Sequence, residues 1–332
     1  MASAAERLPL LALAHVSFLT PREKIVLSDM LGGAERILAL SLSDMAGLLG
    51  RRFVTEAWEP GRLLDRAGEC EKRLTEDGIG CIFYTDAAYP PQLREIFDPP
   101  VTLFFRGRLP SADKPLVGVV GTRFPTGLAR KAAFSLGFEL AACGVGVVSG
   151  LARGIDCEAH EGCVEAGEYT VAVLGSGIDV IYPAQSRKTA QALLDGGGCI
   201  ISEYPPGTPP LKHQFPARNR IISGLCRSVV VVQAPRKSGA LFTAEYALEQ
   251  GRDLFVHADG LEGDSGAGTK SLAESGAPTI RGCADLLREW GIREASQRFQ
   301  GGAPGTGADS AHDAGENNRF VRGTNFVERM NG

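Results

Sequence analysis

The sequence predicts an α/β protein with a doubly wound, mostly parallel sheet, preceded by a small helical domain. From residue 116 onward, runs rich in Val and Ile alternate with helical patterns, as in a parallel sheet covered by helices on both faces. Glycines stand where these helices should end, at Gly144, Gly167 and Gly251. Glycine-containing turns follow the strands, at the edge where such sheets bind their ligands.

Residues 1–78 are expected to form the helical domain. Thr20, Pro21 and Glu23 make the signature of a capped helix start, and Gly32, Gly33 and Gly50 interrupt the pattern. Small bundles of this kind can bind DNA or proteins, but this segment is not basic, which favours a structural cap. The expected helices are Leu8–Leu19, Pro21–Leu31, Ala34–Leu40, Ser43–Leu49 and Pro60–Asp77.

Residues 79–295 are expected to form the sheet domain. Its predicted strands are Gly80–Tyr84, Val101–Arg106, Leu116–Val120, Val145–Ser149, Thr170–Leu174, Cys199–Ser202, Ser228–Gln233 and Asp253–His257. Its predicted helices are Thr126–Cys143, Ile155–Ala166, Gln185–Leu194, Pro216–Leu225, Ala240–Glu249, Lys270–Ser275 and Cys283–Trp290. The polar tail, residues 296–332, is expected to be disordered, with no winged helix, because its stretch 301–318 has almost no large apolar side chains.

The composition is that of an ordinary globular protein and argues against several classes of function. The 332 residues are 44% hydrophobic and 22% charged, with a net charge of −4, so a general attraction to nucleic acid is not expected. No apolar run is long enough for a membrane span and no export signal is recognisable, which predicts a cytoplasmic protein. The eight cysteines form no Cys-x-x-Cys pair and no cluster with the five histidines, which predicts reduced thiols and no metal site.

A local excess of basic residues nevertheless marks residues 205–255. The basic side chains fall mostly on expected loops and helix starts, which suits the binding of phosphate better than a solvated helix face does. They are Lys212, Arg218, Arg220, Arg227, Arg236, Lys237 and Arg252, against the acidic Glu245, Glu249 and Asp253. A polyanion site, if present, should therefore be local.

The first strand-end loop is Gly121-Thr122-Arg123. It lacks the Gly-x-Gly-x-x-Gly spacing of a dinucleotide loop, and Ser149 stands where an acidic residue would hold a ribose. A dinucleotide cofactor is therefore not expected. Arg123 is either a phosphate ligand or a salt-bridged surface residue.

The second loop, Ser149–Asp156, follows a buried strand and precedes a helix, so its glycines and Arg153 could hold an anion. The structural alternative is a tight turn in which Asp156 favours the helix dipole and Arg153 is solvated. A catalytic triad of Ser149, His160 and Asp156 is rejected because no Gly-x-Ser-x-Gly elbow surrounds the serine. Asp156 and His160 are instead expected to pair at i,i+4.

Two further loops follow. Residues 175–183 form a glycine turn that is expected to be architectural.

In residues 203–225, Lys212 and Phe215 stand on a proline-rich loop and Pro216 begins a helix carrying Arg218 and Arg220. A phenylalanine among cations is typical of single-strand binding, but Phe215 could instead fill the core and the arginines could pair with Glu203 or Asp179.

These motifs together resemble the DprA/Smf family. The matching segments are Gly121–Arg123, Ser149–Asp156 with Ala159-His160, Ala172–Pro183, Ile201–Thr208, Arg218–Leu225, Ser238–Ala244 and Leu248–Arg252. The resemblance implies an extended Rossmann-like fold after a SAM-like N-terminal domain. It also implies dimers that bind single-stranded DNA and load the recombinase RecA during natural transformation, with Arg123, Lys212 and Phe215 in the DNA site. Two departures are the absent winged helix and Leu254–Gly260, where members usually read Val-Phe-Ala-Val-Pro-Gly.

The sequence thus predicts a non-enzymatic mediator without catalytic residues, cofactor or metal. Its expected partners are single-stranded DNA, RecA and a second copy of the chain, with no membrane contact. The alternative function is that of a nucleotide phosphoribohydrolase of the LOG type. Residues Ser238–Glu245 faintly resemble the motif of that family but lack its glycine pair. A third reading is an interaction module built on the N-terminal helices. The predicted DNA-binding residues are Gly121, Thr122, Arg123, Ser149, Gly150, Arg153, Lys212, Phe215, Arg218, Arg220, Ser238 and Gly239.

Overall fold

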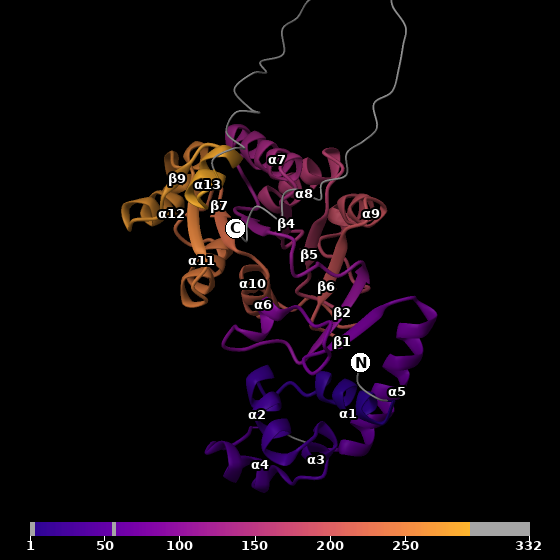
Figure 1. Cartoon of the computed structure of the whole chain (residues 1–332). Coiled ribbons are helices and arrows are strands. Elements are labelled where there is room, and N and C mark those ends of the chain that lie inside the picture. Colours follow the sequence, from indigo (N-terminus) through magenta and orange to yellow (C-terminus); the bar gives the residue numbers. More distant parts are fainter. Residues whose placement is uncertain (1–3, 55–57, 293–332) are drawn as a thin grey trace, which may run out of the picture.

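The computed structural model describes residues 4–54 and 58–292, and its centre is one nine-stranded sheet (Figure 1). The strand order is β1-β2-β6-β5-β4-β3-β7-β8-β9. The pairs β1–β2 and β2–β6 are antiparallel and all others are parallel, which confirms the doubly wound, mostly parallel sheet. The strands are β1 Gly80–Phe83, β2 Thr102–Gly107, β3 Leu116–Val120, β4 Gly146–Ser149, β5 Thr170–Val173, β6 Cys199–Ser202, β7 Ser228–Val231, β8 Asp253–His257 and β9 Thr279–Ile280.

The chain order reverses at β3. Strands β4, β5 and β6 are added on one side of β3, whereas β7, β8 and β9 are added on the other. The carboxyl ends of β3 and β7 are therefore the topological switch point, where sheets of this class bind ligands. This geometry brings the loops after β3, β4 and β5 to one edge.

Helices cover both faces of the sheet. Alternate side chains of β3 divide between them: Val117 and Val119 pack with α7, α8 and α13, whereas Leu116 and Val120 pack with α10 and α11. Helices α7 and α8 touch at two glycines, since a Cβ on Gly137 or Gly162 would lie within 2.3 Å of a carbonyl oxygen of the other helix. The helices are α7 Gly127–Ala142, α8 Ile155–Glu165, α9 Arg187–Asp195, α10 Gln214–Gly224, α11 Gly239–Glu249, α12 Gly263–Glu274 and α13 Cys283–Glu289.

The N-terminal helices share a hydrophobic core with the sheet. Leu11, Leu27 and Met45 are fully buried in the cluster that also contains Phe104 and Ile200. The capped start at Thr20 is confirmed, because the Thr20 and Glu23 side chains each bond the other residue's backbone N–H. The helices are α1 Ala4–Ala14, α2 Pro21–Leu31, α3 Ala34–Leu38, α4 Leu42–Leu49, α5 Pro60–Glu76 and the short α6 Pro91–Arg94.

Several element boundaries differ from those expected. Helix α10 begins at Gln214, so Phe215 lies in its first turn and not on a loop. Helix α12 begins at Gly263, well before the expected Lys270. Its glycine-rich start is typical of a loop. In the structure, a Cβ on Gly266 would lie 2.4 Å from the Gly260 carbonyl oxygen, so only glycine permits the helix to pack here. Helix α6 and strand β9 were not expected.

No helix in residues 4–54 and 58–292 is long and apolar enough to cross a membrane. Within the same ranges, no group of three His, Cys, Asp or Glu side chains is placed to hold a metal ion. All eight cysteines are in the reduced form, and none is joined in a disulfide. The expected disordered tail, residues 296–332, lies outside the described residues.

His160 is the buried histidine of α8. Thr170 Oγ1 donates to the Val147 carbonyl at 2.9 Å, so His160 Nδ1–H must donate to Thr170 Oγ1, 2.8 Å away. The buried Nε2 has no hydrogen-bond partner among the described residues, so burial disfavours a proton there and the imidazole is neutral. Burial lowers the pKa of His160 to about 3, and the positive charge of Arg218 adds to the effect.

This histidine should make stability depend on acid pH. The unfolded chain takes up a proton near pH 6.5, whereas the folded chain does so only near pH 3, so stability should fall as pH drops below 6.5. Between pH 7 and pH 5 the loss should be about 2 kcal/mol. His160→Asn keeps a donor for Thr170 and cannot titrate, so urea denaturation should show a flatter profile by that amount. Parallel profiles would contradict this assignment.

Candidate nucleic-acid interface

The loops after β3 and β7 are joined by hydrogen bonds at the switch point. The Thr122 N–H donates to the Gln233 carbonyl at 2.7 Å, and the Thr126 N–H donates to Gln233 Oε1 at 2.8 Å. Gln233 Nε2 in turn donates to Thr126 Oγ1 at 3.3 Å. Gly121 lies so close to its neighbours that a Cβ would stand 2.6 Å from Ile155. The hydrogen-bonding groups of Thr122, Thr126 and Gln233 at the switch point are therefore engaged by one another.

Asp156 organises the loops after β3 and β4. Its carboxylate accepts backbone N–H groups from Gly150 at 3.1 Å and Ala152 at 3.4 Å, and a further one from Gly121. Burial raises the pKa of this carboxyl, while the nearby Arg218 guanidinium and these three N–H groups oppose the rise. The carboxylate thus takes the place that a bound phosphate would take among strand-end amides. The amides of Gly121, Thr122 and Gly150 are consequently engaged within the protein, a correction to their expected role.

Ser149 and His160 are not arranged for catalysis. The Ser149 hydroxyl is fully buried and donates to the Val119 carbonyl at 2.6 Å. His160 bonds Thr170, so the expected pairing of Asp156 with His160 is wrong. The i,i+4 spacing did not predict the partners correctly, because backbone N–H groups bond Asp156 and Thr170 bonds His160.

Arg218 and Arg220 are buried and do not face solvent. Arg218 is 4% exposed and donates to the Gly150 carbonyl at 3.0 Å. Arg220 is 5% exposed and binds both Glu203 carboxylate oxygens, at 2.7 and 2.6 Å. This corrects their inclusion among the DNA-binding residues and confirms the alternative pairing of Arg220 with Glu203. Asp179, the other acid considered, pairs with Arg73 instead.

The Arg220 ion pairs extend to the N-terminal helices. Asp98 lies 3.2 Å from Arg220, and its carboxylate also accepts the Arg22 N–H of α2 at 2.7 Å. Lys24 of α2 is buried beside this cluster, and burial lowers its pKa to about 8, against the raising effect of Glu203 and Asp98. The helical domain thereby braces the loop after β6, which leads to Lys212.

Aromatic and cationic side chains gather at the carboxyl edge of the sheet. The Arg123 guanidinium lies 5.7 Å from the ring centroid of Phe215, and the Phe215 and Tyr182 centroids are 5.7 Å apart. Phe124 follows Arg123, and the Arg153 guanidinium lies 4.9 Å from its ring centroid. We call these five side chains the aromatic–arginine row. They come from the loops after β3, β4 and β5 and from the first turn of α10.

Phe215 is half-buried at the base of this row. Gly175 permits its position, because a Cβ there would lie 2.9 Å from Phe215 Cδ1. Phe215 is thus neither a fully buried core residue nor a free loop residue. Arg123 and Tyr182 border the rest of the ring.

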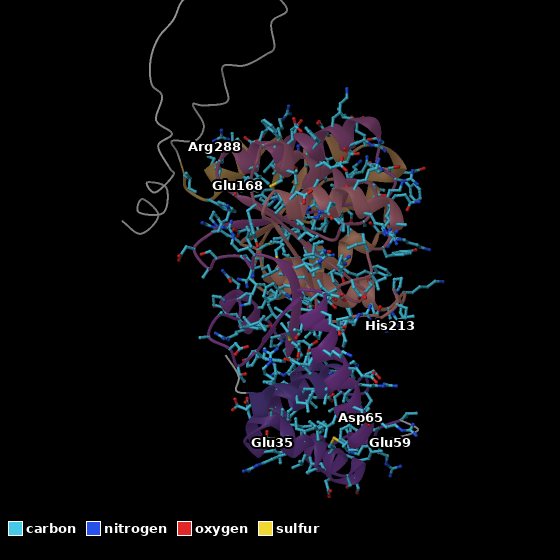
Figure 2. The ribbon with its side chains drawn as sticks, turned by 90° about the vertical axis from the view of Figure 1, so that its right-hand side faces the viewer. Glu35, Glu59, Asp65, Glu168, His213 and Arg288 are labelled. Atoms are coloured by element: carbon cyan, nitrogen blue, oxygen red, sulfur yellow. The ribbon has the colours of Figure 1, made fainter. Side chains whose placement is uncertain are left out.

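Lys212 is exposed just before α10 and makes no ion pair with any described residue. The preceding loop is held by the Gly207 N–H, which donates to Asp179 at 2.7 Å. Figure 2 labels the adjacent His213 at the rim of the molecule. Ser238 and Gly239 lie beyond the row: Ser238 caps α11 by accepting the Ala240 N–H at 3.3 Å.

Phe124 and Tyr182, two members of the row, were not predicted from the sequence. Phe124 is 70% exposed and Tyr182 is 45% exposed, an unusual exposure for large rings. The only sequence signal for Phe124 is its position next to Arg123. Tyr182 belongs to the turn that was expected to be purely architectural.

Comparison with known proteins shows which family the chain belongs to. The sequence model of the family "DNA recombination-mediator protein A" matches residues 80–291. The chain belongs to this family. The resemblance to DprA/Smf proteins is thereby confirmed.

Individual relatives support this assignment. Protein Smf of Synechocystis is 43% identical over 210 residues, which are 62% of this chain and 52% of that protein. DNA processing protein DprA of Streptococcus pneumoniae is 41% identical over 207 residues, covering 62% of this chain and 72% of the relative. The match therefore spans about half the length of the Synechocystis protein.

Solved structures agree with the fold. The crystal structure of Streptococcus pneumoniae DprA superposes with a TM-score of 0.67 at 33% identity, over 87% of this chain and 99% of that one. DNA processing protein A of Helicobacter pylori, a structure concerned with its single-stranded-DNA binding mode, gives 0.57 at 30% identity, over 64% and 95% of the two chains.

The two kinds of arginine should separate in stability measurements. Arg220→Ala removes the partner of Glu203, whose side chain is 11% exposed, and one partner of Asp98, which is 28% exposed, so the free energy of unfolding should fall by about 3 kcal/mol. Arg123→Ala removes an exposed side chain and should change it by less than about 0.5 kcal/mol. Urea denaturation of both variants checks this. Equal losses would contradict the division into buried braces and exposed ligands.

Proposed function

We propose that this chain binds single-stranded DNA along the aromatic–arginine row and passes it to a recombinase. The observation that carries the proposal is the contact between Arg123, Phe215 and Tyr182, which places a cation beside two rings at a sheet edge. Aromatic faces stack on any base and cations hold the backbone, so such a site binds a strand with little regard to sequence.

Each group has a distinct part in this scheme. Arg123, Arg153 and Lys212 hold phosphates, since all three are exposed. Phe215 stacks on a base, supported from behind by Tyr182. Arg218 and Arg220 position the loops and do not contact the strand. Ser238 and Gly239 begin the neighbouring helix α11 and mark the limit of the interface.

We further propose that the recombinase is RecA and that two copies of the chain act together. Family membership supports a role in recombination, and two rows acting on one strand would raise the local concentration of binding sites. The site acts in the cytoplasm under this proposal, where the eight cysteines stay reduced.

The proposed activity is binding without chemistry. The rival phosphoribohydrolase needs a glycine pair before its glutamate, and residues 238–245 lack it. Glu245 is exposed on α11 and does not belong to the row. No structural observation favours the rival, so binding remains the proposal.

Variants should weaken binding in distinguishable ways. Lys212→Ala and Arg123→Ala should each lower the slope of log affinity against log salt by roughly 0.7, the value for one phosphate on a single strand. Phe215→Ala should lose about 1–3 kcal/mol of binding free energy while keeping the slope. Titration of a fluorescent oligo(dT) over a salt series measures both quantities.

A matched control is Arg288→Ala, because Arg288 is exposed on α13 and lies far from His213 in Figure 2. Its affinity and salt slope should equal those of the wild type. Duplex DNA of equal length should bind more weakly than the single strand. Tighter binding to blunt duplex, or a normal salt slope in both Lys212→Ala and Arg123→Ala, would refute the proposed site.

A further inference from the structure

Phe124 is a large apolar side chain left in solvent at the edge of the interface. Its side chain is 70% exposed, and Pro125 and the 57% exposed Leu128 follow it along the chain. Its covalent neighbour Arg123 already contacts Phe215. Phe124 therefore continues the row in which the stacking residue Phe215 stands.

The loop around Phe124 is held in place. The Phe124 N–H donates to Thr122 Oγ1 at 3.2 Å, and the Ile155 N–H donates to the Thr122 carbonyl at 3.3 Å. Gly154 approaches this loop so closely that a Cβ would lie 2.5 Å from the Thr122 carbonyl oxygen. Two loops from different strands are thus fixed against each other before any ligand binds.

Arg153 gives the ring a cationic neighbour from the second loop. Its guanidinium lies 4.9 Å from the Phe124 centroid, which leaves no room for a base between them. A base can stack only on the opposite face of the ring. Arg153 then remains beside the base, where it can reach the phosphate of the same nucleotide.

We propose that Phe124 and Arg153 form a second base-stacking subsite for single-stranded DNA. This subsite takes a different nucleotide from the one that stacks on Phe215, and the two positions are linked through the adjacent residues Arg123 and Phe124. The inference rests on the proposed function, because it assigns a second position on the same interface. The strand accordingly runs from Tyr182 and Phe215 across Arg123 to the start of α7.

The test compares Phe124→Ala with wild type on two oligomers of equal length. On oligo(dT), the variant should bind roughly 5-fold to 100-fold more weakly, the loss of one stacked base. On an oligomer whose bases are all replaced by abasic sites, the two proteins should bind alike, because only the backbone remains. Phe124→Leu keeps apolar volume without an aromatic face and should behave as Phe124→Ala does.

Phe124→Trp restores the aromatic face and should restore affinity, with quenching of its added fluorescence by oligo(dT). Phe97→Ala is the matched control, since Phe97 is 74% exposed and lies 4.1 Å from the Arg22 guanidinium, outside the row. This control should bind as wild type does. Thermal melts should be unchanged for every variant, because both rings are exposed.

The outcomes separate the subsite from the function on which it rests. Wild-type affinity of Phe124→Ala for oligo(dT), beside weakened binding by Phe215→Ala, would overturn the second subsite and leave the proposed function standing. An equal loss on the abasic oligomer would also overturn it, since stacking cannot be the cause. Failure of the wild type to bind oligo(dT) would overturn both.

Discussion

The interface depends on one buried carboxylate. Asp156 gathers backbone N–H groups from two strand-end loops, and Arg218 lies against the same glycine turn. In a nucleotide-binding sheet these amides would face a phosphate. Here an internal anion satisfies them, so the loops are fixed without a ligand. Under the proposed function, binding therefore falls to the side chains that the loops display and not to the backbone.

The basic residues divide accordingly into two populations. Arg218 and Arg220 are buried and brace the loops, whereas Arg123, Arg153 and Lys212 remain exposed. Buried ion pairs contribute little net stability but are severely destabilising when one partner is lost, which suits braces. Exposed arginines beside aromatic rings keep their charge available to phosphate. Two basic residues of the N-terminal helices also contact the sheet domain. Lys24 is buried beside its acidic residues, and Arg73 forms an ion pair with one of them.

The sequence predicted most of the fold and part of the site. Strands β3, β6 and β8 and helix α2 match their expected bounds, because continuous apolar runs and capping residues are local signals. The sequence left the pairing of Arg220 with Glu203 as one of two alternatives, and it carried no signal for the contacts of Arg218 with Gly150 and Asp156. The pairing of Phe124 with Arg153 is likewise a contact between two loops. Spacing along the chain carries no information about such contacts.

The most direct test of the account is photochemical cross-linking of the wild-type protein to a single strand carrying 5-iodouracil, with the adducts mapped by mass spectrometry. Halogenated uracil reacts with rings on which it stacks, so the adducts report which aromatic residues contact bases. The account predicts adducts on Phe215 and Phe124, within the aromatic–arginine row. Adducts confined to aromatic residues of the N-terminal segment, such as Phe18 or Trp58, would contradict it.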